Sequence, residues 1–158
     1  MRKFYQNKTI WLVGTMLCAA GVGAAVLGAL NPTMSAETAA DAKDPRLKTR
    51  RYQLQGDLPQ MSRKISEIIP TLRTWGSNWR LVARQTDNSS ENQAFIRAEI
   101  PVVVFMDDVS IELQREGDEV IVNARSNSRI SQEGSDFGEN KRHLLQILQV
   151  LDKEFEHN

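Results

Sequence analysis

The stretch that decides the fold runs from Phe105 to Arg142 and reads FMDDVSIELQREGDEVIVNARSNSRISQEGSDFGENKR. Apolar and polar residues alternate over residues 109–115 and again over 119–126. This period of two is typical of strands with one buried face. The residues between them, Glu116-Gly117-Asp118, predict a tight turn, because glycine tolerates the backbone angles that short hairpins need. We therefore predict an antiparallel β-hairpin.

Two further strands are expected before this hairpin, over residues 79–85 and 94–104, where the same alternation occurs. Pro101 cannot donate a hydrogen bond to a ladder, so the second strand should be an edge, bulge or break there. In residues 79–85 the alternation predicts Trp79, Leu81 and Ala83 on the inner face.

Helical patterns flank the strands on both sides. Before them, Asp57 is a candidate N-cap, and apolar residues follow at helical spacing: Leu58, Met61, Ile65, Ile68, Leu72 and Trp75. After them, Asp136 is a candidate N-cap with Glu139 at the capping-box position. The apolar face of this last helix comprises Leu144, Ile147, Leu148, Leu151 and Phe155.

The order helix, four strands, helix predicts an α+β fold for residues 58–158. We expect a two-layer domain in which a four-stranded antiparallel sheet carries both helices on its apolar face. The uncovered face would display Arg80, Arg84, Arg97, Glu99, Glu112, Asn123 and Arg125. Such a row is either a solvated face of weak cross-strand ion pairs or an arginine-lined surface for an anionic partner. We favour the first interpretation.

The N-terminal part of the chain predicts a membrane segment. No charged residue occurs from Ile10 to Leu30, and a spanning helix needs about 20 apolar residues. The basic residues of the leader, residues 1–9, predict a cytoplasmic N-terminus and a domain on the far side. Residues 31–57 are small, polar and charged, so we expect a linker there. Cleavage of the segment as a signal peptide, near Ala40 or Ala42, stays open as the alternative.

Composition excludes several classes of function. The 20 basic side chains are balanced by 20 acidic ones, which does not suit a nucleic-acid binder. The single cysteine, Cys18, lies in the apolar segment, so no intrachain disulfide can form. Only His143 and His157 could supply imidazole, and zinc chemistry is not expected. We expect neither a metal nor a cofactor, and we assign no oligomeric state.

Polar residues at one end of the hairpin predict a structural clasp. Asp107 and Asp108 begin one strand and Arg125 and Arg129 leave its partner, so carboxylates and guanidiniums should meet. Ser126 and Ser128 fall on the inward parity, where they are expected to bond loop backbone. Asp136 and Asn140, at the helix N-terminus, are expected to tie the loop over residues 130–135 to the sheet.

Two ligand sites at the same place stay open as alternatives. An anion could bind at the helix N-terminus beside the arginines, with Arg142 adjacent. Calcium could bind the carboxylates, although their spacing does not match the calcium-loop pattern. Catalysis is disfavoured, because Asp107 and Asp108 are neighbours on a strand and should point to opposite faces.

Three motifs in this region carry a resemblance to a known family. They are Phe105-x-Asp107-Asp108-Val109, Arg125-Ser126-x-Ser128-Arg129 and Ser135-Asp136-x-Gly138-x-Asn140. The chain thereby resembles domain of unknown function family 1499, small bacterial and plastid proteins, over residues 62–154. The resemblance implies no activity. The chain departs from the family pattern in a longer link after Arg129, in Ser131 where glycine is expected, and in His143 where arginine is usual.

Together these patterns predict a membrane-anchored, extracytoplasmic domain in a periplasm or thylakoid lumen. We expect a non-catalytic binding or assembly accessory module. Residues 10–30 hold it in the membrane, where it meets a protein partner. A small-molecule or lipid carrier is one alternative, and it would need a cavity between sheet and helices. A hydrolase that uses Asp107 and Asp108 is the other.

Overall fold

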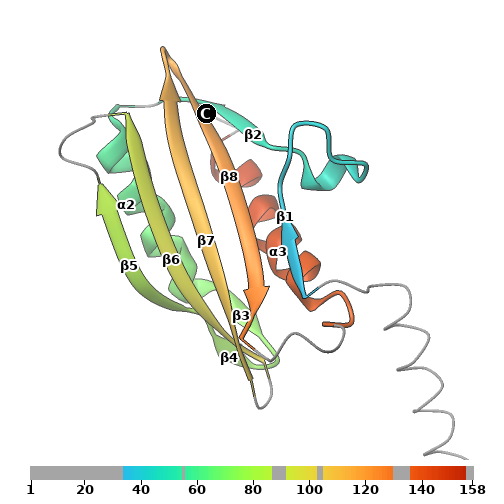
Figure 1. Cartoon of the computed structure of the whole chain (residues 1–158). Helices are drawn as coiled ribbons and strands as arrows, with labels where there is room; N and C mark the ends of the chain where they lie inside the picture. Colours follow the sequence, from blue (N-terminus) through green and yellow to red (C-terminus); the bar gives the residue numbers. More distant parts are fainter. Residues whose placement is uncertain (1–33, 55, 87–91, 103–104, 130–135, 156–158) are drawn as a thin grey trace, which may run out of the picture.

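The β7–β8 hairpin is the centre of the sheet in the computed structural model of the chain (Figure 1). Strands β7 (Phe105–Glu116) and β8 (Glu119–Ser128) pair antiparallel without interruption from Asp107↔Ser128 to Glu116↔Glu119. Gly117, in the turn, has φ +63°, a value that glycine adopts without steric cost. The predicted hairpin is confirmed.

The structure describes residues 34–54, 56–86, 92–102, 105–129 and 136–155. Six strands form the main sheet, in the order β1-β8-β7-β6-β5, with β2 also paired to β8. The other four are β1 (Ser35–Glu37), β2 (Arg50–Gln53), β5 (Arg80–Thr86) and β6 (Gln93–Val102). All pairs are antiparallel. The antiparallel α+β class is confirmed, but the expected number of four strands is wrong.

The two additional strands come from the segment that was expected to be a linker, residues 31–57. Strands β1 and β2 lie one after the other along β8, opposite residues 125–127 and 119–122. Between them lies the short 3-10 helix η1 (Pro45–Leu47). The prediction failed because these strands are too short and polar to show a periodic pattern. Their pairing depends on β8, which would otherwise expose a row of unpaired backbone groups.

In the edge strand β5, some side chains lie on the opposite face of the sheet from the one predicted. Its register against β6 shifts between Leu81 and Ala83, so Ala83 pairs with Arg97 on the outer face. Leu81 pairs with buried Ala98 on the helix side, yet it remains 40% exposed at the sheet edge. Pro101 lies beyond Glu99, the last β6 residue that pairs with β5, and β6 continues there without a break.

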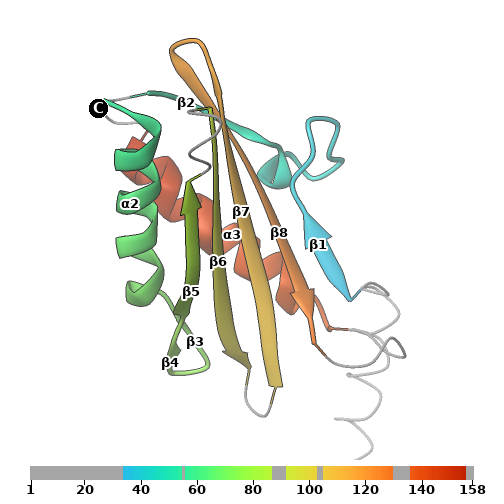
Figure 2. The ribbon, with the colours of Figure 1, turned by 60° about the vertical axis from the view of Figure 1, so that its left-hand side comes forward.

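Two helices cover one face of the sheet (Figure 2). Helix α2 (Leu58–Ile68) begins at Asp57, whose carboxylate accepts a hydrogen bond from the Gln60 backbone N–H at 2.7 Å. It continues into the 3-10 helix η2 (Ile69–Thr71). This change of helical period buries Ile69 in place of the predicted Ile68. Helix α3 (Glu139–Phe155) buries all five predicted apolar residues.

A small hairpin, β3 (Arg73–Thr74) with β4 (Ser77–Asn78), follows η2. Trp75 in its turn is 61% exposed and therefore lies outside the core, contrary to the predicted stripe. In the described ranges no helix is long and apolar enough to cross a membrane. The leader and the predicted span, residues 1–30, lie outside the described residues.

Hydrogen exchange distinguishes the observed strands from a linker. We expect the backbone amides of Thr38 and Leu54 to exchange at least roughly a hundredfold more slowly than an unstructured peptide, because they donate to Ala124 and Asp118 of the hairpin. The amide of Asp41, in the exposed turn between the strands, is the fast-exchanging control. Equal rates at all three positions would contradict the pairing of β1 and β2 with β8.

Candidate functional site

The two neighbouring aspartates point to opposite faces of the sheet. Asp107 is 2% exposed and faces the helices, whereas Asp108 lies on the outer face. Strand alternation separates them, as predicted. The predicted clasp is therefore two separate groups of residues, one buried and one exposed.

The buried group, which we call the buried polar cluster, comprises Asp107, Ser126, Ser128, Asn140 and His143. Asn140 lies at its centre with no exposed area. Its Oδ1 accepts a hydrogen bond from Ser126 Oγ at 2.6 Å, and its Nδ2 donates to Ser128 Oγ at 3.0 Å. The helix α3 is thereby bonded to the end of β8. This part of the predicted clasp is present in the structure.

Asn140 also holds the beginning of the described chain. Its Nδ2 donates to the carbonyl oxygen of Met34 at 2.9 Å, and the backbone N–H of Ser128 donates to the same oxygen at 3.0 Å. The backbone N–H of Asn140 donates to Asp136, whose other carboxylate oxygen accepts from the Gly138 N–H. One side chain thus connects the N-terminal segment, β8 and α3.

His143 is the buried titratable group next to Asn140. Its Nδ1 lies 3.5 Å from both Asp107 Oδ2 and Ser126 Oγ, and its Nε2 lies 3.8 Å from Glu139 Oε2. Burial, with the positive charge of Arg142, lowers the pKa of His143 from 6.5 to about 4. Burial raises the pKa of Asp107, although a hydrogen bond with Ser128 opposes that shift. Both shifts favour the neutral forms, as expected in a dry interior.

On the outer face, Arg129 bridges two carboxylates. Its Nε donates to Asp108 Oδ2 at 2.8 Å, and its Nη2 donates to Asp108 Oδ1 at 2.6 Å and to Glu99 Oε1 at 2.5 Å. This bidentate contact lowers the pKa of Asp108 and raises that of Arg129. Asp108 and Arg129 meet as predicted.

Arg125 and Arg142 do not join either group. Arg125 donates to Asn127 and lies 3.9 Å from Glu37, while Arg142 pairs with Glu139 on its own helix and is mostly exposed. The predicted meeting of Arg125 with an aspartate is wrong. The reason is the register of the hairpin: Arg125 pairs with Ser110, two residue pairs further into the sheet than Asp108, which pairs with Asn127.

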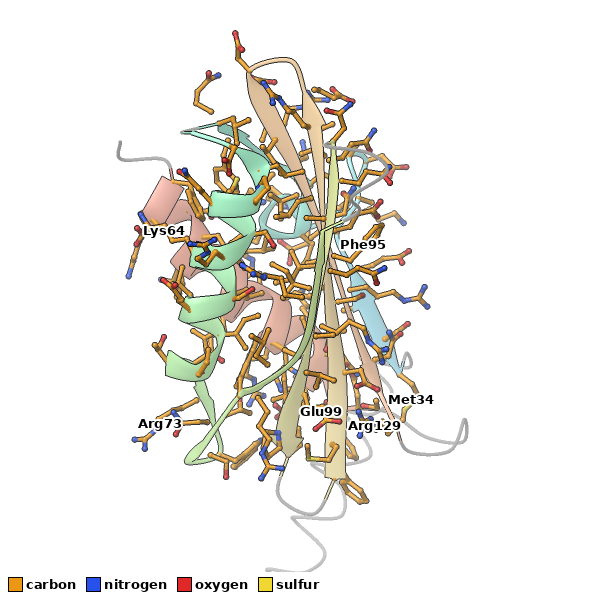
Figure 3. All side chains as sticks on the ribbon, turned by 90° about the vertical axis from the view of Figure 1, so that its left-hand side faces the viewer. Met34, Lys64, Arg73, Phe95, Glu99 and Arg129 are labelled. Carbon is orange, nitrogen blue, oxygen red and sulfur yellow. The ribbon has the colours of Figure 1, made fainter. Side chains whose placement is uncertain are left out.

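The predicted open face is present with one correction. Arg80, Arg97 and Glu112 lie opposite outer-face residues, whereas Arg84 pairs with the buried Ile96 and so belongs to the helix side. The register shift at Leu81/Ala83 moves it there. Figure 3 shows the two sides, with Lys64 on the helix layer and Phe95 on the outer face.

The geometry of the buried polar cluster does not support nucleophilic catalysis. A serine nucleophile needs one nitrogen of the histidine and the orienting carboxylate the other. Here Ser126 and Asp107 approach the same nitrogen, and Ser126 has no exposed area. Among the described residues, no three histidine, cysteine or acidic side chains are grouped so as to hold a metal ion.

The space between sheet and helices is filled by the hydrophobic core. Among the described residues, eleven leucine and isoleucine side chains and Trp79 are the largest that are fully buried. They come from both layers and include Ile65, Ile111 and Leu144. A carrier would need this space for a ligand.

Sequence reasoning missed several members of the site. The predicted clasp does not include His143, and Glu139 is predicted only as a capping residue. Glu99 was placed on the open face without its contact to Arg129. A signal for His143 did exist, because it lies one turn before Ile147 on the apolar face of α3. Nothing in the sequence indicated the contact of Met34.

Comparisons with known proteins give one family match. The family model described as "Protein of unknown function (DUF1499)" matches residues 28–151. No curated protein matches the chain significantly.

Among solved structures, the chain is similar to the Saccharomyces cerevisiae Ran-binding protein Mog1p and to a point mutant of protein Mog1. Each similarity has 10% identity and a TM-score of 0.37, and covers 74% of this chain and 77% of the other. Similarity at this level indicates nothing about what the present chain binds.

Asn140 offers a direct test of the buried polar cluster. We expect Asn140→Leu to cost about 3 kcal/mol, because Ser126, Ser128 and the Met34 carbonyl each lose a buried partner. Urea unfolding measures the loss. The matched control is Asn123→Leu, where only a half-buried bond from Thr49 is lost and a cost below about 1 kcal/mol is expected. Equal costs would show that the cluster contributes no special stability.

The buried His143 predicts a pH dependence of stability. The unfolded chain takes up a proton near pH 6.5, whereas folded His143 resists protonation down to about pH 4. The folded state therefore loses stability as pH falls through this window, by at most about 3 kcal/mol. Asp107 acts in the opposite direction, because its raised pKa lets the folded chain take up a proton first.

Comparison with His143→Gln isolates the histidine from Asp107 and the other nearby charges. The unfolding free energies of the wild-type chain and of His143→Gln are measured from pH 7 to pH 4. The two values should converge as pH falls. Parallel curves would show that His143 titrates alike in the folded and unfolded states.

Proposed function

The chain belongs to the DUF1499 family of proteins of unknown function, and on this premise we propose that it is a non-catalytic binding or assembly module anchored at a membrane. Residues 10–30 form the anchor in this proposal, and the domain lies on the extracytoplasmic side, in a periplasm or thylakoid lumen. The uncharged run from Ile10 to Leu30 and the basic leader before it support this topology.

The position of β1 supports an anchor that is retained. A signal peptidase cut near Ala40 or Ala42 would fall after β1 and before β2. Such a cut would remove Thr38, whose backbone and hydroxyl both bond Ala124, and would uncover part of the β8 edge. The cleaved chain would also lose the Met34 contact to Asn140. Cleavage at these positions would therefore cost the domain part of its sheet.

The observation that carries the binding role is a mixed surface around β5, which we call the β5 surface. Three arginines form no ion pair with any described residue, and three neighbouring apolar side chains are 40–51% exposed. The members lie around the edge of the sheet: Arg80, Arg97 and Phe95 on its outer face, Arg84 and Leu81 on its helix side, and Val82 at the register shift. Elsewhere on the sheet, Arg129 is paired with Asp108 and Arg51 with Glu116. Unpaired arginine beside exposed apolar area is typical of a binding surface.

The chemistry of the β5 surface favours an acidic, extended segment of a protein partner. Strand β5 is the outermost strand of the sheet, so its outer backbone groups can pair with an added strand. Arg80 and Arg84 lie on this edge, where a second copy of β5 would bring like charges together. Carboxylates on a partner strand would instead pair with them.

Membrane preparations that contain the full chain test both parts of the proposal. We expect the wild-type chain to remain in the pellet after carbonate extraction and, once solubilised, to migrate in a complex larger than the chain itself. Arg80→Glu with Arg84→Glu should weaken that complex roughly tenfold or more, because two interfacial ion pairs of about 1 kcal/mol each are lost.

The matched control is Arg63→Glu with Lys153→Glu, which reverses two exposed charges on the helices. The control should leave the complex intact. Release of the wild-type chain by carbonate would contradict the anchor. A complex that survives reversal of Arg80 and Arg84 would contradict the β5 surface.

A further inference from the structure

We propose that one end of the domain rests on the lipid bilayer, with Trp75, Phe105 and Phe137 as its contact residues. This inference depends on the anchor in the proposed function, and it adds an orientation and a lipid-binding surface. We call this end the Met34 end. It holds the β3–β4 hairpin, the start of β7 and the start of α3 (Figures 1 and 2), and Figure 3 labels Met34 at the same end.

Exposed aromatic rings are concentrated at the Met34 end. Trp75, Phe105 and Phe137 are 61%, 49% and 46% exposed, and they come from three segments far apart in the sequence. Phe95, on the outer face, is the other large aromatic ring among the described residues that is comparably exposed. Tryptophan and other aromatic rings are favoured at the boundary between lipid and water, where part of the ring leaves water and part remains wet.

The chain length before Met34 requires this end to lie near the membrane. If residues 10–30 cross the bilayer, Met34 lies four residues after Leu30 along the chain. An extended chain of this length spans at most about 14 Å. The Met34 carbonyl is fixed to the domain by the Ser128 N–H and by Asn140. The domain therefore cannot move away from the surface as it would on a long linker.

Two of these aromatic residues also have an unfavourable backbone conformation. Trp75 and Phe137 have φ +51° and +52°, and they are the two non-glycine residues with positive φ in the part of the chain that the structure describes. This conformation costs roughly 1 kcal/mol or more for a residue with a Cβ atom. In the β3–β4 turn, Trp75 and the following Gly76 both have positive φ, which is the arrangement of a type I′ turn. Unfavourable backbone angles that persist at exposed aromatic residues are consistent with a contact role.

In the proposed orientation, one end of the sheet lies at the membrane and the other end lies away from it. Strand β7 runs from Phe105 at the Met34 end to Glu116 at the hairpin turn. At about 3.4 Å per residue this strand is roughly 40 Å long. Figure 3 shows Met34, Arg73, Glu99 and Arg129 at one end of the molecule. The turn at Gly117 and Asp118 should therefore lie far from the lipid surface.

Fluorescence quenching in vesicles tests the proposal on the full chain. In a Cys18→Ser background, a fluorophore is attached at Phe105→Cys or, as the matched control, at Asp118→Cys. Each protein is reconstituted into phosphatidylcholine vesicles with and without nitroxide-labelled phosphatidylcholine. We expect the nitroxide lipid to quench the label at position 105 strongly and the label at position 118 not at all.

A second variant tests the aromatic contacts themselves. Trp75→Asn with Phe137→Asn should reduce the quenching at position 105 and leave vesicle binding unchanged, since asparagine tolerates positive φ. Phe95→Asn, which removes an exposed ring from the outer face, is the control and should have no effect.

The outcomes separate this inference from the function on which it rests. Flotation of the chain with vesicles, together with equal quenching at positions 105 and 118, would overturn the orientation and leave the anchor intact. Failure to float would contradict the anchor itself. A label at 105 that neither nitroxide lipid nor aqueous iodide can quench would show that protein covers this end, which also overturns the proposal.

Discussion

The structure depends on the complete hydrogen bonding of one buried amide, that of Asn140. An amide removed from water costs several kcal/mol unless its donors and acceptor find partners. Here Ser126, Ser128 and Met34 supply them, and they come from β8 and from the start of the described chain. All of these hydrogen bonds form together in one arrangement of α3, β8 and the N-terminal segment. The amide therefore determines how these three segments pack against one another. The charged residues of the outer face could vary without such consequences.

The local pattern of apolar and polar residues was sufficient to predict those helices and strands that bury one regularly spaced set of side chains. The β7–β8 hairpin, the apolar face of α3 and the Asp57 cap each depend on residues close in sequence. Prediction failed where pairing or position is determined from a distance. Strands β1 and β2 carry no period of their own, and their partner β8 lies more than 60 residues further along the chain. The register shift at Leu81/Ala83 has no local signal either, and it changed the face assigned to Arg84.

In the candidate site, too, local pattern predicted some features and failed for those that depend on distant parts of the chain. Alternation correctly assigned Asp107 and Asp108 to opposite faces, and it put Ser126 and Ser128 inside. It could not show which arginine reaches Asp108, because that choice depends on the offset between neighbouring strands. His143 was underestimated because a histidine on an apolar helix face is ordinarily a packing residue. Its importance depends on the Asp107 carboxylate and the Ser126 hydroxyl, which other segments bring near it, and on Glu139 of its own helix.

The pairing of β1 with β8 has a consequence for the order in which the chain folds. Thr38 bonds Ala124, 86 residues later, so the first strand in the sequence has no partner until the last strand has been made. Contacts of such long range are expected to form late, since the intervening loop must first be closed. During synthesis, residues 35–53 would thus remain open while β5 to β8 assemble as a meander. Pairing of β1 and β2 with β8 would then be the last step. This pairing would therefore occur only in a domain whose other strands are already in place.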